Sequence, residues 1–190
     1  MAKPIVLKEI VRRNIYEIYA KNGYRVGAEI GVYQGRNAVN ILNTVPELTL
    51  YGIDSWAVFP KKRRFNKKHQ KLNYNLMKQR TRNFRKNKRF IVIKKNSMDA
   101  VKDFEDGSLD FVYIDANHEF DYVMRDIIEW SKKVRVGGII SGHDYSKRII
   151  GVKIAVDAYV QAHEIKTWHI TNIEKGKHDK WNSFFWVKEC

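Results

Sequence analysis

A strand that runs into a glycine turn and then into a helix is the feature of this sequence that most limits its possible folds. The apolar run Val26–Ile30 is typical of a buried strand, and Ala38–Leu42 is typical of a helix. Between them, Gly31 and Gly35 stand four positions apart and follow the carboxylate of Glu29. Glycine is needed in such a turn when a ligand lies directly against the backbone, because a Cβ atom would collide with that ligand. An ordinary tight turn of an α/β protein has the same pattern, so the rest of the chain must distinguish the two interpretations.

Strand and helix patterns alternate along the 190 residues and predict one α/β domain with a doubly wound sheet. Residues 1–23 predict an N-terminal helix over 5–22, from the spacing of apolar side chains and the Asn22-Gly23 ending. Residues 24–188 predict a mostly parallel sheet of seven strands whose last strand is antiparallel. The strands are expected at 25–30, 48–53, 89–93, 109–114, 139–141, 166–171 and 182–188, and the helices at 38–43, 66–87, from 97, 120–132 and 151–162.

Polar residues follow the ends of five successive strands, while the strand bodies are apolar. An open α/β sheet binds its ligand at the carboxyl ends of its strands, so these side chains predict a binding edge. Asp54 ends the second strand and is suited to accept hydrogen bonds from both hydroxyls of a nucleoside ribose, although a helix N-cap or turn aspartate has the same position. The residues at the strand ends are Glu29, Asp54, Asn96 with Ser97, Asp115, and His143 with Asp144.

The chain is strongly basic, with 36 lysines and arginines against 21 acidic residues and a net charge of +15. A polyanionic partner would explain this charge, and so would genome composition or selection for solubility. Residues 60–95 contain no acid, and the basic helical segment 60–89 is either a solvated face or a surface for phosphate, sulfate or uronate groups. Nucleic acid is one partner that Lys61–Arg89 would bind. The sequence has no zinc spacing or RNA-recognition motif to strengthen that interpretation.

The sequence predicts a cytoplasmic location and no membrane association. Its N-terminus lacks the pattern of a signal peptide, and no apolar run approaches the length of a membrane span. Cys190 is its single cysteine, which excludes an internal disulfide framework and fits a reducing compartment.

The glycine turn resembles a known family when it is read together with the strand-end acids. The Glu-x-Gly-x-x-x-Gly pattern followed by Asp54 is similar to class I S-adenosylmethionine-dependent methyltransferases, over about residues 24–188. Residues 28–39 resemble the glycine loop of catechol-type O-methyltransferases. Residues 114–118 and 137–145 resemble small bacterial and phage enzymes grouped with sugar and macrolide O-methyltransferases. The resemblance implies a Rossmann-like three-layer sandwich and S-adenosylmethionine as the cofactor.

By position, the resemblance assigns a set of cofactor-binding residues. Many relatives carry an acid where Asn96 stands, and an amide can still form a hydrogen bond with adenine. The assigned residues are Glu29, Gly31, Tyr33, Gly35 and Asn37 for the methionine end, Asp54 for the ribose, Ser55, Trp56, Asn96 and Ser97 for the adenine, and Asp115.

The same resemblance implies residues for catalysis and for a metal. Methyl transfer needs in-line positioning and removal of the acceptor's proton, which metal-dependent relatives assist with a divalent ion. Asp115 and Asp144 stand where those relatives hold the ion, which is expected to be Mg or Mn. His143 stands beside them in place of an aspartate, and histidine suits Mn or Zn better than Mg. His118 is placed to act as a general base beside Asp115 and His143. The alternatives are that His118 caps a helix and that His143 orients a loop.

The expected function is S-adenosylmethionine-dependent O-methylation of a small hydroxylated, sugar-like or anionic acceptor. RNA methylation is one alternative, favoured by the basic segment. Against it stands the missing Asn/Asp-Pro-Pro-aromatic tetrad of amino methyltransferases, which cannot occur because the only prolines are Pro4, Pro46 and Pro60. A non-catalytic binder of polyanions or nucleic acid on a methyltransferase fold is the other alternative. The intact glycine loop and Asp54 argue against loss of cofactor binding.

Overall fold

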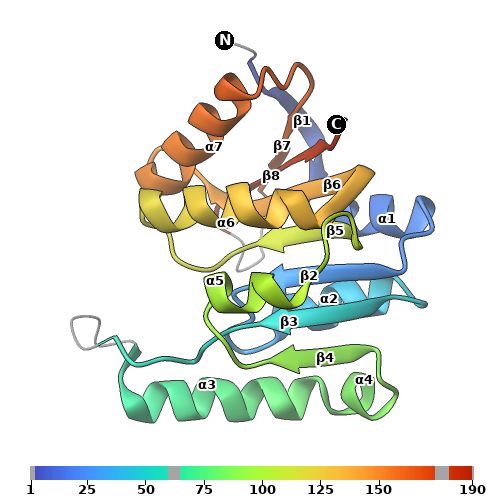
Figure 1. The fold of residues 1–190 in the computed structure, drawn as a ribbon, viewed down its shortest axis with the longest axis vertical. Helices are drawn as coiled ribbons and strands as arrows, with labels where there is room; N and C mark the ends of the chain where they lie inside the picture. Colours follow the sequence, from blue (N-terminus) through green and yellow to red (C-terminus); the bar gives the residue numbers. More distant parts are fainter. Residues whose placement is uncertain (1–2, 60–64, 174–179, 190) are drawn as a thin grey trace.

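A computed structural model describes residues 3–59, 65–173 and 180–189, which build one sheet with helices on both faces (Figure 1). Lys61–Arg64 of the basic segment and Cys190 lie outside the described residues. Within them, no helix is long and apolar enough to cross a membrane. The elements are β1 (Ile5–Val11), α1 (Arg12–Lys21), β2 (Val26–Ile30), α2 (Arg36–Thr44), β3 (Thr49–Ile53), α3 (Lys67–Arg80), α4 (Arg82–Lys86), β4 (Phe90–Ile93), α5 (Ser97–Ala100), the 3₁₀ turn η2 (Val101–Asp103), β5 (Leu109–Ile114), α6 (Phe120–Lys133), β6 (Val134–Tyr145), α7 (Ile150–Ala162), β7 (His169–Asn172) and β8 (Asn182–Val187).

The sheet confirms the α/β class, with the strand order β1-β7-β8-β6-β5-β2-β3-β4. Neighbouring strands are parallel except for β8, which is antiparallel to both β6 and β7. The prediction of a mostly parallel sheet with an antiparallel last strand is therefore confirmed. The predicted number of strands is wrong, because the described residues form eight strands rather than seven.

The additional strand is β1, which takes up the first half of the segment predicted to be one N-terminal helix. Residues 5–7 and Val11 pair in parallel with β7, with an irregular register between Leu7 and Val11, and the amide of Ile5 donates to the carbonyl of Trp168 over 2.9 Å. The helix begins only at Arg12 and ends at Asn22-Gly23 as predicted. The spacing of apolar residues was compatible with a helix, but β-branched side chains and the free edge of β7 favour a strand.

Helices cover the two faces of the sheet with separate apolar clusters (Figure 1). On one face, α6 and α7 pack with the side chains of Val123, Ile127, Trp130, Val152 and Val156. On the other face, α1, α2 and α3 pack with the side chains of Ile15, Tyr19, Ile41, Leu42 and Met77. This three-layer arrangement leaves the ends of the strands free to hold a site.

The basic helix predicted over 66–87 is divided into α3 and α4. The division falls at Thr81, whose buried hydroxyl donates to the carbonyl of Met77 over 2.8 Å. A threonine that bonds back to the preceding turn competes with the regular helical pattern and bends it.

The register of the parallel strands brings five strand ends to the same level. The pairs that define it are Ile30 with Ile53 and Ile114, Ile53 with Ile93, and Ile114 with Gly142. The next residue along each strand therefore lies at one carboxyl edge. These residues are Gly31, Asp54, Lys94, Asp115 and His143.

Gly31 is required by the chain itself at this edge. Its φ is +96°, and a Cβ atom there would lie 2.1 Å from the carbonyl oxygen of Asp115. At Gly35, the nearest atoms to a Cβ belong to Met77 and Thr81, at 3.1 and 3.2 Å. The close approach of the segments that follow β2 and β5 is thus enough to require glycine at position 31, and the roles of Gly31 and Gly35 in binding a cofactor stay predictions.

Replacing Gly31 by alanine should destabilise the fold severely. We expect Gly31→Ala to cost more than ~3 kcal/mol, because steric overlap adds to the backbone strain. Gly23→Ala is the matched control, since Gly23 has a φ of +66° with nothing within 4 Å of its Cβ position. It should cost only about 1 kcal/mol. Urea unfolding of both variants measures the difference, and similar losses would contradict the close approach at Gly31.

Candidate functional site

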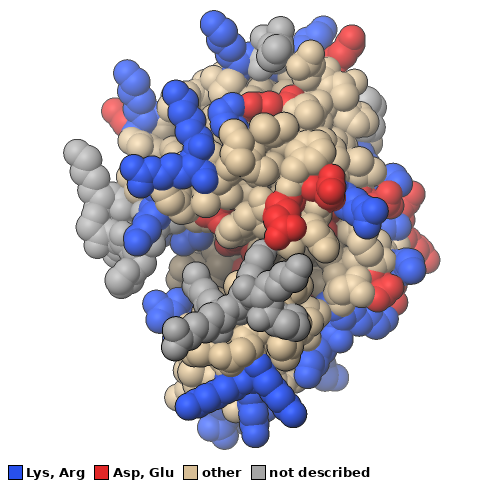
Figure 2. Space-filling view, turned by 90° about the vertical axis from the view of Figure 1, so that its left-hand side faces the viewer, with Lys and Arg blue, Asp and Glu red and all other residues tan. Residues whose placement is uncertain are grey.

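The carboxyl edge of the sheet is a hollowed face with acidic side chains near its middle. Figure 2 looks onto this edge, from the left of Figure 1. Asp and Glu side chains lie beside the hollow, and Lys and Arg side chains spread over the lower end, where α3 lies. This face therefore has acidic side chains beside its hollow and basic side chains at the end where α3 lies.

Glu29 lies near the end of β2 and has a carboxylate oxygen without a hydrogen-bond partner. Its side chain is 1% exposed, and Oε1 accepts from the Asn37 amide over 2.9 Å. Oε2 has no hydrogen-bond partner. The Tyr16 hydroxyl donates to Asn37 Oδ1 and orients that amide. Burial raises the pKa of Glu29 to about 8, against the opposing effect of the Asn37 hydrogen bond. Glu29 is therefore suited to a cationic ligand group that would satisfy Oε2.

Asp54 joins the two loops that follow β2 and β3. Its Oδ2 accepts from the Tyr33 amide over 2.8 Å, and its Oδ1 accepts from the Trp56 amide over 2.7 Å. The Trp56 indole donates back to the carbonyl of Tyr33 over 2.8 Å. Burial raises the pKa of Asp54, and the two amides oppose that rise. Each carboxylate oxygen has a further lone pair for a ligand hydroxyl, so Asp54 can both shape the loops and bind.

Trp56 and Ser55 use their side chains within the protein. The Trp56 ring is buried, and its centroid lies 4.8 Å from that of Tyr74 in an edge-on contact. The Ser55 hydroxyl accepts from the Ala57 amide over 3.2 Å. Their assignment to adenine stays a prediction.

Asn96 and Ser97 are also engaged locally. Asn96 is the N-cap of α5 and accepts from the Asp99 amide over 2.9 Å. The Ser97 hydroxyl donates to Asp126 and accepts from the Trp130 indole over 2.7 Å. These contacts direct the hydroxyl of Ser97 toward α6, so its contact with adenine also stays a prediction.

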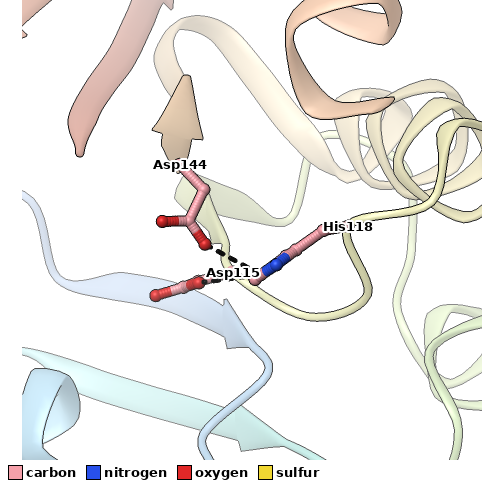
Figure 3. A group of neighbouring side chains, drawn as sticks. All are labelled: Asp115, His118 and Asp144. Carbon is pink, nitrogen blue, oxygen red and sulfur yellow. Dashed lines mark ion pairs between the residues drawn. The ribbon is translucent and has the colours of Figure 1, made fainter. Parts of the chain in front are cut away.

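Asp115, His118 and Asp144 converge from three segments to form the acidic centre (Figure 3). Asp115 follows β5, His118 lies in the loop before α6, and Asp144 lies near the end of β6. His118 Nε2 is 2.8 Å from Asp144 Oδ2 and 3.9 Å from Asp115 Oδ1. One ligand atom from each of the three residues lies within 4.8 Å of the others. Two carboxylates and one imidazole at this spacing form a donor set for a divalent cation.

The electrostatics of this cluster favour positive charge between the two acids. Interaction with Asp115 and Asp144 raises the pKa of His118 to about 9, although burial opposes it. Burial alone would raise the pKa of Asp144, but hydrogen bonds with His118 and His143 hold it well below its usual value. An imidazolium therefore occupies the region between the carboxylates at neutral pH.

His143 supports the cluster from its other side. Its Nδ1 lies 2.9 Å from Asp144 Oδ1, and its side chain is buried. The sequence grouped Asp115, His143 and Asp144 as metal ligands, whereas the structure brings His118 together with the two acids. A ring that fixes a ligand carboxylate from behind tunes a metal site without binding the ion.

Tyr16 is the residue that the sequence interpretation missed. It lies 21 positions before Asn37 in the chain, and only the packing of α1 against α2 brings the two together. No local pattern around Tyr16 indicates this contact.

Comparison with known proteins places these features in a family. A family model described as a methyltransferase domain matches residues 28–145. No curated protein matches the chain.

Solved structures share the fold. The O-methyltransferase from Bacillus cereus in complex with SAH is 16% identical, with a TM-score of 0.64 over 93% of this chain and 80% of that chain. The O-methyltransferase NovP is 20% identical, with a TM-score of 0.65 over 94% of this chain and 78% of that chain. TomG from Streptomyces achromogenes, an O-methyltransferase in complex with SAM, is 12% identical, with a TM-score of 0.64 over 93% of this chain and 78% of that chain. At these identities the likeness establishes the fold.

The charge of His118 should make stability depend on pH. Because the folded pKa of about 9 exceeds the ordinary 6.5, His118 contributes stability below pH 6.5 that is lost as the pH rises to about 9. We expect the difference in melting temperature between the wild type and His118→Asn to shrink over this interval, with chelator present to remove metal. A difference in melting temperature that stays constant from about pH 6 to about pH 9.5 would contradict the raised pKa of His118.

Proposed function

This chain belongs to the methyltransferase-domain family, and on that premise we propose that it transfers the methyl group of S-adenosylmethionine to an oxygen atom of a small hydroxylated acceptor. The match covers residues 28–145 and confirms the methyltransferase class that the glycine turn predicted. The observation that carries the proposal is the level arrangement of Asp54 and Asp115 at one carboxyl edge. Asp54, which we assign to the nucleoside, and Asp115 of the proposed cation site then lie on either side of β2.

The cofactor lies, in this proposal, along Glu29, Asn37 and Asp54. The free Oε2 of Glu29 suits the ammonium group of the methionine end, because a buried acceptor without a partner is costly. Asp54 suits the ribose hydroxyls through its remaining lone pairs. S-adenosylmethionine supplies a methyl group that its sulfonium already activates. Two of the structural neighbours carry SAH or SAM, which supports the choice of cofactor.

The acceptor lies, in this proposal, beside Asp115, His118 and Asp144, which fit a divalent metal such as Mn or Mg. Their donor set of two carboxylates and an imidazole is the structural reason. A divalent ion held there would polarise an acceptor hydroxyl and lower its pKa. His143 keeps Asp144 oriented, and the backbone of Asp144 is held at a φ of +62°.

His118 is assigned as a metal ligand because its Nε2 lies 2.8 Å from Asp144 Oδ2 and 3.9 Å from Asp115 Oδ1. With a pKa raised to about 9 by the two acids, the imidazole carries a proton at neutral pH and cannot accept another. A cation between the acids would take the place of that proton. The alternative role, a general base that works without metal, would be favoured only near pH 9 and above.

The role of Asp54 in binding ribose can be separated from its role in shaping the loops. We expect Asp54→Asn to weaken binding of S-adenosylhomocysteine by about 10- to 100-fold, since a hydrogen bond to a charged group contributes ~1.5–3 kcal/mol. The wild type should discriminate against the 2′-deoxy analogue, and Asp54→Asn should lose that discrimination. Calorimetric titration measures both affinities, with Asp103→Asn as a control acid that pairs with Lys95 on the surface. Equal discrimination in the wild type and Asp54→Asn would refute the ribose assignment.

The metal role predicts a dependence on chelator. We expect chelator to lower turnover by ~100-fold or more at neutral pH, because Lewis-acid assistance contributes several kcal/mol, and added Mn to restore it. Asp144→Asn should abolish Mn binding in a calorimetric titration, whereas Asp121→Asn, an exposed acid at the start of α6, should leave it unchanged. Full activity in chelator that increases toward pH 9 would instead support His118 as a metal-free base.

A further inference from the structure

The positive charge of this protein is concentrated in one segment. Residues 60–95 contain 16 of the 36 lysines and arginines and none of the 21 acids, so the rest of the chain has 20 basic and 21 acidic residues. A lysine-rich genome composition or selection for solubility would spread the charge along the chain. We propose that the face formed by α3 and α4 binds single-stranded nucleic acid through its phosphates. This inference goes beyond the proposed function and does not depend on it.

The cations of this face are free to bind a partner. Six of its basic side chains are exposed and have no acidic partner within the ranges 3–59, 65–173 and 180–189. They are Lys67, Lys68, Lys71, Arg82, Lys86 and Lys88. Some basic side chains elsewhere on the surface are neutralised by acids, as Lys133 is by Asp106 and Arg135 by Asp110. Unpaired cations keep their full attraction for an external polyanion.

The spacing of the cations forms a line that leads to the candidate site. Lys67, Lys71 and Lys78 are four and seven positions apart, which places them along one side of α3. The ammonium groups of Lys78 and Lys94 both lie 4.9 Å from the centre of the Tyr74 ring. Lys94 follows β4 and is level with Asp54 in the sheet register. The line of positive charge therefore continues from the helix to the carboxyl edge.

The form of this face favours a linear polyanion with bases over a membrane surface. A helix of 14 residues spreads its cations over about 21 Å instead of converging them on one point. Within α3 and α4, Leu72 is the one exposed large apolar side chain, and a lipid-binding face needs several. Tyr74 and Phe84 are each partly exposed among the cations and otherwise pack against the core, and basic groups beside aromatic rings are the combination that binds single strands. Figure 2 shows no acidic side chain in the visible part of this lower end.

The test is binding of a short fluorescein-labelled oligouridylate, followed by fluorescence anisotropy at salt concentrations from about 50 to 200 mM. The test variant combines Lys67→Gln, Lys71→Gln and Lys86→Gln. The matched control combines Lys8→Gln, Lys21→Gln and Lys166→Gln, which removes the same charge from exposed positions outside the face. All six side chains are exposed, so melting temperatures should stay at the wild-type value and verify folding.

We expect the wild type to bind with a steep salt dependence. The test variant should lose about tenfold or more in affinity, and its salt slope should fall by about 2, since each phosphate contact contributes about 0.7 in single strands. The control variant should bind as the wild type does. Equal losses in both variants, no binding by the wild type, or tighter binding to anionic vesicles, polyglutamate or heparin than to the oligouridylate would each overturn the proposal. None of these outcomes depends on methyl transfer, so the two proposals fail separately.

Discussion

The parallel hydrogen-bond ladder on both sides of β2 is the constraint on which the rest of this structure depends. The amide of Gly31 donates to the carbonyl of Ile53, and the amide of Asp115 donates to the carbonyl of Ile30, each over 2.8 Å. These bonds continue the ladder to the last residue of each strand and leave room only for glycine at position 31. A shift of one residue would turn every side chain to the opposite face and move Asp54 away from the level of Asp115. The geometry of the candidate site is therefore a property of the backbone pairing.

The carboxyl edge of the sheet holds buried acids whose pKa values are shifted in opposite directions. Glu29 lies in an apolar environment with one amide partner, so burial dominates and raises its pKa to about 8. Asp144 is buried as well, but two imidazoles hold its pKa below its usual value. Glu29 is thus an acid that a cationic group would ionise, whereas Asp144 is already ionised. Such a difference between neighbouring groups is how a site separates binding from chemistry.

Backbone strain is concentrated at the same edge. Tyr33, Trp56 and Asp144 have φ values of +50°, +45° and +62°, which cost non-glycine residues about 1–3 kcal/mol each in such regions. Each is stabilised by contacts of the site, since Asp54 accepts from the amides of Tyr33 and Trp56, and His118 pairs with Asp144. The carboxylates that we propose as ligands to the cofactor and the metal are therefore also the groups that hold the strained loops. Removal of one would disturb both binding and loop geometry.

The sequence by itself determined the α/β class, the glycine turn and the acids at the strand ends, because these depend on local periodicity, conformation and spacing. The tertiary structure decided what depends on contacts between distant residues. It made a strand of residues 5–11, since only the free edge of β7 gives their backbone partners. It joined Tyr16 to Asn37, and it placed His118 rather than His143 between the two acids. Spacing along a chain specifies where a strand ends, whereas the direction of a side chain is set by the packing of segments that are far apart in sequence.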